Sequence, residues 1–145
     1  MELTEEIFDS PVNSVASHIQ RYVRTGGKKG QLWYGRNTLL LTTRGRKTGF
    51  LRRTVAIYGE DEDRYVLVAA NNGLPTHPCW YLNLVDDPEV WVQVGADTFP
   101  GTARPATPDE RPELWKFMLT VLPHYAAYQA KIEREMPVVI LERNP

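Results

Sequence analysis

The sequence contains one cysteine, no long apolar run and three scattered histidines, and each of these shortages excludes a class of protein. A single thiol, Cys79, cannot build an internal disulfide framework. The histidines His18, His77 and His124 lack the spacing of metal ligands, so we expect no metal site. No run approaches the roughly 20 apolar residues of a membrane helix, and the amino end does not resemble a signal peptide. We therefore expect a cytoplasmic protein.

Motifs for nucleotide binding and for nucleophilic hydrolysis are also missing. No G-x-G-x-x-G follows an expected strand, and the segment GRKTG (45–49) lacks the upstream glycine of a Walker A loop. No serine lies in a G-x-S-x-G elbow. With 17 Lys and Arg against 18 Asp and Glu, the chain lacks the basic surplus that tracking a phosphate backbone requires. We therefore expect neither a hydrolase nor a nucleic-acid partner.

The length of 145 residues, with 42% hydrophobic and 24% charged residues, fits one globular domain over 1–145. Apolar periodicity predicts an amphipathic N-terminal helix (about 11–25) and three more helices that begin near Pro78, Thr107 and Pro123. Six strands are expected, at 38–43, 54–58, 64–70, 90–94, 98–104 and 137–141. The acidic segment 59–63 is expected to be a turn. Mostly sequential antiparallel strands with helices at one end predict an α+β fold built on a small barrel.

Two of the helices carry further signals. Thr107, Pro108 and Glu110 have the spacing of a capping box with proline in the first turn. The apolar stripe of the N-terminal helix packs on the barrel or, alternatively, contacts a membrane surface, where Lys28 and Lys29 would suit anionic headgroups. We expect packing on the barrel, and transient contact with the inner face of the membrane stays open.

Basic residues are concentrated in one short segment between two apolar, β-branched runs. Five cations lie within ten residues, at Arg44, Arg46, Lys47, Arg52 and Arg53. Arginine binds carboxylates and phosphates bidentately, and Gly45 and Gly49 permit a turn whose N–H groups converge on an anion. The alternative is a solvated hairpin whose charges discourage edge pairing. From the residues alone, both interpretations stay open.

Several aromatic and histidine side chains have an ordinary structural explanation. Tyr125 and Tyr128 stand three residues apart on the last helix, where core packing is the usual cause of such spacing. Trp80 likewise fits a core position, and His77, which precedes a proline, fits a helix cap. His124 is the titratable base beside the tyrosines.

Five segments of the sequence, in order, resemble a known family. They are LLLTTRGRKTGFLRRTV (39–55), YVLVAANNG (65–73), HPCWYLNL (77–84), DPEVWVQVG (87–95) and YAAYQAKIEREMPVVILE (125–142). Together they are similar to the deazaflavin-dependent nitroreductase and F420-dependent quinone reductase family of actinobacteria. Because the five blocks keep the family order and cover most of the chain, the resemblance is far more specific than any one motif.

The resemblance implies a split β-barrel, related to the barrels that bind flavin mononucleotide, with coenzyme F420 as its cofactor. F420 carries a deazaflavin ring, a phosphodiester and a tail of glutamates, so its polyanionic tail is the implied partner of the five cations. By match to the family motif, the phosphate and glutamate channel is expected at Arg44, Gly45, Arg46, Lys47, Thr48, Gly49, Arg52, Arg53 and Thr54. The ring is expected to be bordered by Ala69, Ala70, Asn71, Asn72, Gly73, His77 and Trp80.

The implied function is that of an oxidoreductase that passes a hydride from reduced F420 to a quinone or a nitroaromatic acceptor. Tyr125 and Tyr128 match the family's catalytic tyrosines on the acceptor side. The alternative is a module that binds deazaflavin, or less expectedly flavin mononucleotide, and carries it without turnover. The chain departs from the family at several positions. Asn71 and Asn72 stand where serine and lysine are usual, the position after Gly73 lacks a second glycine, Thr76 replaces a frequent lysine, and Leu122 replaces a tyrosine. Both a monomer and a dimer are compatible with the sequence.

Overall fold

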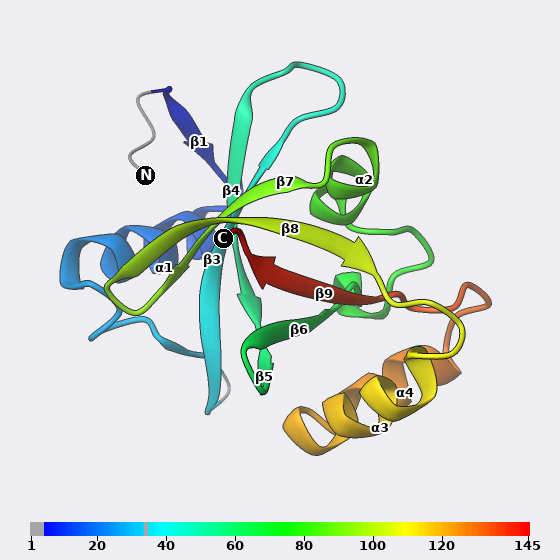
Figure 1. Ribbon diagram of the computed structural model, residues 1–145. Helices are drawn as coiled ribbons and strands as arrows, with labels where there is room; N and C mark the ends of the chain where they lie inside the picture. The colour runs from blue at the N-terminus through cyan, green and yellow to red at the C-terminus, as the bar shows by residue number, and fades with distance from the viewer. Residues whose placement is uncertain (1–4, 34) are drawn as a thin grey trace.

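The computed structural model describes residues 5–33 and 35–145. Within these residues the protein is a mixed α+β structure, as expected, with one nine-stranded sheet and four α-helices (Figure 1). The strands are β1 (Ile7–Asp9), β2 (Leu32–Trp33), β3 (Arg36–Arg44), β4 (Leu51–Ile57), β5 (Gly59–Asp61), β6 (Arg64–Val68), β7 (Glu89–Val94), β8 (Asp97–Pro105) and β9 (Val138–Arg143). The helices are α1 (Asn13–Thr25), α2 (Cys79–Asp86), α3 (Arg111–Val121) and α4 (His124–Ala130), with a short 3-10 helix η1 (Asn71–Gly73).

All six expected strands are present, but the expected number was wrong because the sheet contains three further short strands, β1, β2 and β5. β1 and β2 are too short to show the alternation that identifies a strand in a sequence. β5 was expected to be part of a turn because it is acidic, yet its backbone pairs with β6 from Gly59 to Asp61. The turn itself is confined to Glu62 and Asp63, and Glu62 adopts a left-handed φ of 58°.

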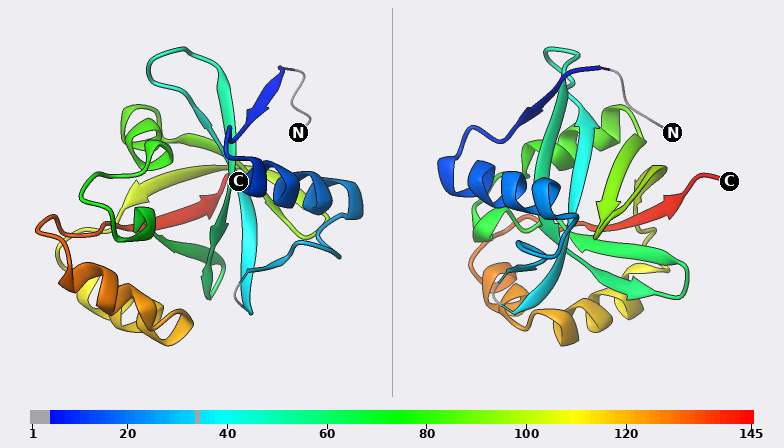
Figure 2. Two further views of the ribbon diagram at one scale, coloured as in Figure 1. Left: turned by 180° about the vertical axis from the view of Figure 1, so that it is seen from behind. Right: turned by 90° about the vertical axis from the view of Figure 1, so that its left-hand side faces the viewer.

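The sheet curls so that the chain passes directly from β4, the strand next to one edge, to β5 at the other edge. The strand order is β1-β4-β3-β7-β8-β9-β6-β5, with β2 paired to β3. The pairing of β1 with β4 is parallel, whereas the other pairs are antiparallel. β4, one strand from the first edge, runs through Tyr58 alone into β5, which is the opposite edge (Figure 2). No strand pair in the described part of the chain joins β5 to β4, so the sheet is a curled, open one.

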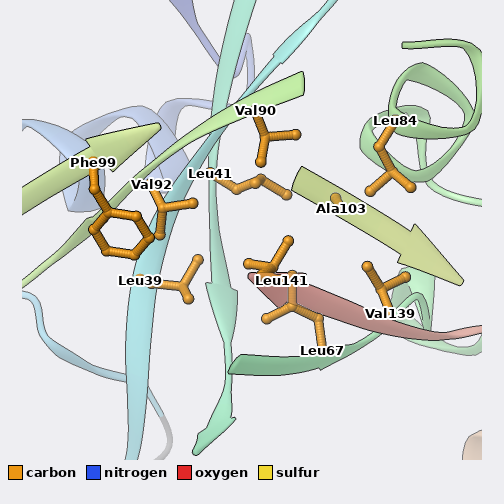
Figure 3. Packing of buried hydrophobic residues seen from close by; sticks show 10 residues of the cluster. All are labelled: Leu39, Leu41, Leu67, Leu84, Val90, Val92, Phe99, Ala103, Val139 and Leu141. Carbon is orange, nitrogen blue, oxygen red and sulfur yellow. The ribbon is translucent and has the colours of Figure 1, made fainter. Parts of the chain in front are cut away.

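The concave side of the sheet holds the main core. Leu39 and Leu41 on β3 point to this side, together with Leu67 on β6 and Leu141 on β9 (Figure 3). Leu40, between the first two, faces the other side, as the two-residue period of a strand requires. A second cluster lies between the strands β6 and β9 and the helices α3 and α4, which cover one end of the sheet.

Helix α1 packs its apolar stripe on the outer side of the sheet, which confirms the first of the two alternatives for this helix. Ile19 and Tyr22 are fully buried there against Leu40 and Val55. The helix ends at Gly26, whose left-handed φ of 61° suits glycine. No helix of the described residues is long and apolar enough to cross a membrane.

The capping box before α3 is confirmed. The Thr107 N–H donates to Glu110 Oε1 at 2.9 Å, and the Glu110 N–H donates to Thr107 Oγ1 at 3.2 Å. Glu110 also accepts two hydrogen bonds from Arg104, which, with the Thr107 N–H, lowers the pKa of the Glu110 carboxyl from 4.5 to about 2. Because the folded pKa is depressed, this stabilisation is present above pH 4.5 and is lost as the pH falls toward 2.

We expect Tyr22→Phe to lower the free energy of unfolding by about 1–3 kcal/mol, because it leaves two backbone groups without their hydrogen-bond partner. The hydroxyl of Tyr22 donates to the Thr38 carbonyl at 2.9 Å and accepts the Gly95 N–H at 2.8 Å. Urea unfolding followed by fluorescence measures the loss. Tyr65→Phe is the matched control, since the Tyr65 hydroxyl makes no hydrogen bond among the described residues; an equal loss in both variants would contradict the explanation.

Candidate active site

A cavity of about 1030 Å³ opens between the β3–β4 hairpin loop, β1, the loop around η1, the start of α2, and α4. This volume suits a ligand of cofactor size. Most of the residues expected at the site line it, namely Gly45, Arg46, Lys47, Thr48, Arg52, Arg53, Thr54, Ala70, Asn71, Asn72, His77, Trp80, Tyr125 and Tyr128. Arg44, Gly49, Ala69 and Gly73 belong to the same loops but do not line the cavity.

Arg44 is directed away from the cavity and holds the hairpin loop closed. Its Nη1 pairs with the carboxylate of Glu5 and donates to the Gly49 carbonyl at 2.9 Å. This placement differs from the expectation of a residue in the anion channel. The sequence lacked the information to separate it from its neighbours, because the partner Glu5 lies 39 residues away.

Arg53 lines the cavity but already has a counter-ion. Asp9 on β1 lies opposite Arg53 in the parallel pairing, and its carboxylate accepts from Nε at 2.6 Å and from Nη2 at 3.2 Å. Gln20 on α1 donates a further hydrogen bond to Asp9 Oδ2 at 2.6 Å. Asp9 was missed by sequence reasoning because β1 was not predicted.

Arg46 is held by a buried amide on α2. The backbone N–H and Nη1 of Arg46 both donate to Asn83 Oδ1, at 3.2 and 3.0 Å. Asn83, which is 4% exposed, in turn donates from Nδ2 to Thr43 Oγ1 at 3.1 Å. The helix α2 therefore fixes the start of the hairpin loop, and Asn83 was present in the quoted HPCWYLNL block without being assigned a role.

The cavity has a strong positive bias at the hairpin end. Its lining residues include one carboxylate, Asp9, and five cations. Four of the cations, Arg46, Lys47, Arg52 and Arg53, lie at the hairpin end, whereas Arg36 lies at the start of β3 and donates to the Val121 carbonyl at 2.6 Å. In the part of the chain that the structure describes, no carboxylate lies within 4.0 Å of Arg46, Lys47 or Arg52. The guanidinium of Arg52 lies 5.5 Å from the ring centre of Phe8. This arrangement attracts a polyanion.

The loop after β6 follows an unusual backbone path that explains its two asparagines. Asn71, Asn72 and Gly73 have φ values of 49°, 55° and 74°, all in the left-handed region. Asparagine tolerates this region better than other side chains with a Cβ. Asn71 Nδ2 also donates to the Thr76 carbonyl at 2.9 Å, which closes the loop. The departures from the family pattern at 71 and 72 are therefore compatible with a tightly folded loop.

The two tyrosines on α4 lie at the end of the cavity opposite to the hairpin loop (Figure 1). Tyr125 is 5% exposed and packs in the second core cluster, so the core interpretation and the cavity interpretation both hold for it. Burial, followed by the neighbouring Tyr128, raises the pKa of the Tyr125 hydroxyl. Neither tyrosine hydroxyl makes a hydrogen bond to any described residue. Tyr125 therefore presents a protonated, unpartnered donor at neutral pH.

The model of the F420H(2)-dependent quinone reductase family matches residues 14–143. The chain belongs to this family. An F420H(2)-dependent quinone reductase of Mycobacterium tuberculosis is 37% identical over 131 residues, which are 88% of each chain. Similarity to solved structures agrees: an F420-H2-dependent reductase, FDR-A, is 40% identical with a TM-score of 0.67, over 72% of this chain and 93% of its own. Another solved structure, described as a domain-swapped dimer, is 36% identical with a TM-score of 0.70, over 92% of this chain and 100% of its own.

We expect Gly73→Ala to destabilise the protein more than Gly49→Ala. Both glycines have a left-handed φ, of 74° and 75°, so both alanines incur backbone strain of about 1 kcal/mol. At Gly73 the new Cβ would also lie 3.0 Å from Tyr128 Cδ1, whereas at Gly49 it would meet nothing within 4 Å. Thermal unfolding of the two variants measures the difference. Equal melting temperatures for the two variants would contradict the predicted clash between the new Cβ and Tyr128.

Proposed function

We propose that this chain is an F420-dependent oxidoreductase that transfers a hydride from the reduced deazaflavin to a quinone. Membership of the F420H(2)-dependent quinone reductase family supports the reaction and the cofactor. The observation that carries the proposal within this molecule is the cavity itself. Among the described residues, three cations without a nearby carboxylate line one end of it, and two tyrosines whose hydroxyls have no hydrogen-bond partner line the other. The cations suit the phosphate and glutamates of the coenzyme, and the tyrosine hydroxyls suit a small electron acceptor.

The hairpin end fits the anionic part of F420. Arg46, Lys47 and Arg52 line this end and have no carboxylate within 4.0 Å among the described residues, and each charged hydrogen bond that they form contributes about 1.5–3 kcal/mol. Arg53 is partly neutralised by Asp9 and therefore contributes less net charge. The loop residues Gly45 and Thr48 bring backbone close to the same region, which suits phosphate oxygens.

The other end fits the deazaflavin ring and the acceptor. Bound in its reduced form, F420 supplies the hydride from carbon 5 of its ring. Ala70, Asn71 and Trp80 line the region between the hairpin loop and α4, where the ring is expected. Tyr125 and Tyr128 are the catalytic residues in this proposal, because their hydroxyls donate hydrogen bonds to the quinone oxygen as negative charge develops on it.

The acceptor class extends to nitroaromatic compounds in this proposal, because a nitro oxygen gains negative charge on reduction in the same way as a quinone oxygen. A panel of menadione and simple nitroaromatics, assayed with the same reduced cofactor, measures the preference. Contact with a membrane, where lipid quinones reside, stays a prediction from the sequence. Flotation with anionic liposomes tests it.

We also propose that the curled sheet is the split barrel of the flavin-binding type. The direct passage from β4 through Tyr58 to β5 supports this, because it keeps β4 close to the edge strand β5 although the two strands are not paired among the described residues. A crystal structure with bound coenzyme would test it, since the cofactor should then lie against β4 and the loop after β6.

Binding and turnover are tested in one titration. Tryptophan fluorescence, to which Trp80 in the cavity wall contributes, is followed while F420 or flavin mononucleotide is added. We expect quenching at lower F420 than flavin concentrations, and return of the F420 absorbance when menadione is added to the reduced complex. Binding without reoxidation would instead indicate a cofactor carrier, and tighter binding of flavin mononucleotide would contradict the cofactor assignment.

We expect the double change Arg46→Ala with Lys47→Ala to weaken glutamylated F420 by about tenfold or more, from the loss of charged hydrogen bonds to the tail. The tail-less deazaflavin chromophore should lose much less affinity. Lys28→Ala with Lys29→Ala is the matched control, because it removes two charges from exposed side chains that do not line the cavity. Equal losses of affinity for the tailed and the tail-less compounds would contradict the assignment of the hairpin end to the coenzyme's tail.

We expect Tyr125→Phe and Tyr128→Phe each to lower kcat for menadione reduction by about ten- to a hundredfold, since a donor to the developing oxyanion is removed. The Kd for F420 should change little, because the hydroxyls are placed at the acceptor. Stopped-flow oxidation of the reduced complex measures kcat. Wild-type rates in both variants would show that the tyrosines only pack the cavity wall.

A further inference from the structure

One guanidinium organises the loop that borders the cavity between β6 and α2. Arg134, in the segment between α4 and β9, donates from Nη2 to the carbonyls of Ala70 and Leu74 at 2.9 and 3.1 Å. Its Nε donates to Leu74 at 3.2 Å, and its Nη1 donates to the Ala69 carbonyl at 3.1 Å. Nη1 also lies 3.2 Å from Nδ1 of His77. The five N–H donors of an arginine therefore all have an acceptor in this one loop.

The contact with Arg134 decides which nitrogen of His77 carries the proton. A guanidinium has only donors, so Nδ1 must offer its lone pair, and the proton of the neutral ring must be on Nε2. Burial and the charge of Arg134 lower the pKa of His77, which favours the neutral ring. The ring lies 4.9 Å from that of Tyr81, which fixes its plane. His77 lines the cavity, and its Nε2 has no hydrogen-bond partner among the residues described.

Arg134 is itself tied to the helix that carries the tyrosines. Gln129 on α4 donates from Nε2 to the Arg134 carbonyl at 2.8 Å and accepts the Met136 N–H at 2.7 Å. No carboxylate lies within ion-pair distance of Arg134 in the described chain, so its charge is stabilised by the loop carbonyls. The loop, the arginine and α4 therefore form one connected unit.

We propose that Arg134 is a positioning residue that locks His77 in the tautomer protonated on Nε2, and that His77 donates a hydrogen bond to an acceptor atom of the deazaflavin ring. The tautomer lock stands without the proposed function, whereas the ring contact rests on it. Lysine cannot replace Arg134, because an ammonium has three donors and lacks the planar fork that spans Ala69, Leu74 and His77 at once.

Nitrogen NMR of histidine in the cofactor-free protein tests the lock. Long-range proton–nitrogen spectra at pH 7.5 should show His77 as a neutral ring with its proton on Nε2, and His77→Gln identifies its signals. The exposed His124, which makes no hydrogen bond to a described residue, is the internal control and should show averaged tautomers. In Arg134→Lys, His77 should average as His124 does. A proton on Nδ1 or an averaged His77 in the wild-type spectrum would overturn the lock, whether or not the Arg134 variant folds.

Two substitutions that mimic different ring nitrogens test the contact with the ring. Glutamine places its amide nitrogen near the position of Nε2, whereas asparagine places it near Nδ1. The probe is the tail-less deazaflavin chromophore, so the cations at the hairpin do not contribute. We expect His77→Gln to bind within about threefold of wild type and His77→Asn to bind about tenfold more weakly, as for one lost hydrogen bond.

The outcomes separate the two proposals. Equal affinity for wild type, His77→Gln and His77→Asn would overturn the ring contact while F420 turnover still supports the proposed function. A wild-type protein that binds no deazaflavin at all would overturn the proposed function and the ring contact together. The NMR spectrum decides the tautomer lock in either case, because it requires no ligand.

Discussion

The antiparallel pairing of β3 with β4 is the constraint on which the rest of the structure depends. The seven-residue register from Thr38–Ile57 to Arg44–Leu51 sends alternate β3 side chains to the concave core and to α1. The same pairing ends in the loop that carries the cations, and its outer edge receives β1. Core, helix packing and the anion end of the cavity therefore share one hydrogen-bonded ladder. A shift of one residue in its register would turn the core-facing side chains of one strand toward the opposite side of the sheet.

The five cations of the hairpin have different tasks despite their proximity in the sequence. Arg44 closes the loop, Arg53 is neutralised by Asp9, and Arg46 is oriented by Asn83. The charge that faces a ligand is thus smaller than the charge that the sequence contains. Pairing two of the arginines within the protein reduces the repulsion among cations that lie close together, which allows the loop to keep one conformation before any anion is bound.

Local patterns predicted the parts of the fold that depend on neighbours in the chain. The apolar run of β3, the capping box at Thr107 and the apolar stripe of α1 all correspond to the structure. β1 escaped because three residues have no measurable period, and its strand conformation is supplied by pairing with β4, more than 40 residues away.

Residues of the candidate site were predicted where the family resemblance assigned them a role, and they were missed where a side chain acts on a distant element. Arg134 stands in the charged run KIERE, which looks like a solvated surface, and its acceptors are backbone carbonyls that no residue type reveals. The sequence gives one hint of a role for Arg134. It lies between a helix and the last strand, where neither element requires a charged side chain. Asp9 and Asn83 escaped for the same reason, since their partners come from other elements.

The amino-terminal strand has a practical consequence for anyone who handles this protein. Phe8, Asp9 and Val12 form part of the cavity wall, so changes to this segment act directly on the candidate site. A truncated protein that begins after Asp9 would lack the part of the cavity wall that β1 forms, and Arg53 would lose its counter-ion Asp9. Differences in cofactor affinity between preparations with different N-terminal segments would then originate in the three-residue strand β1.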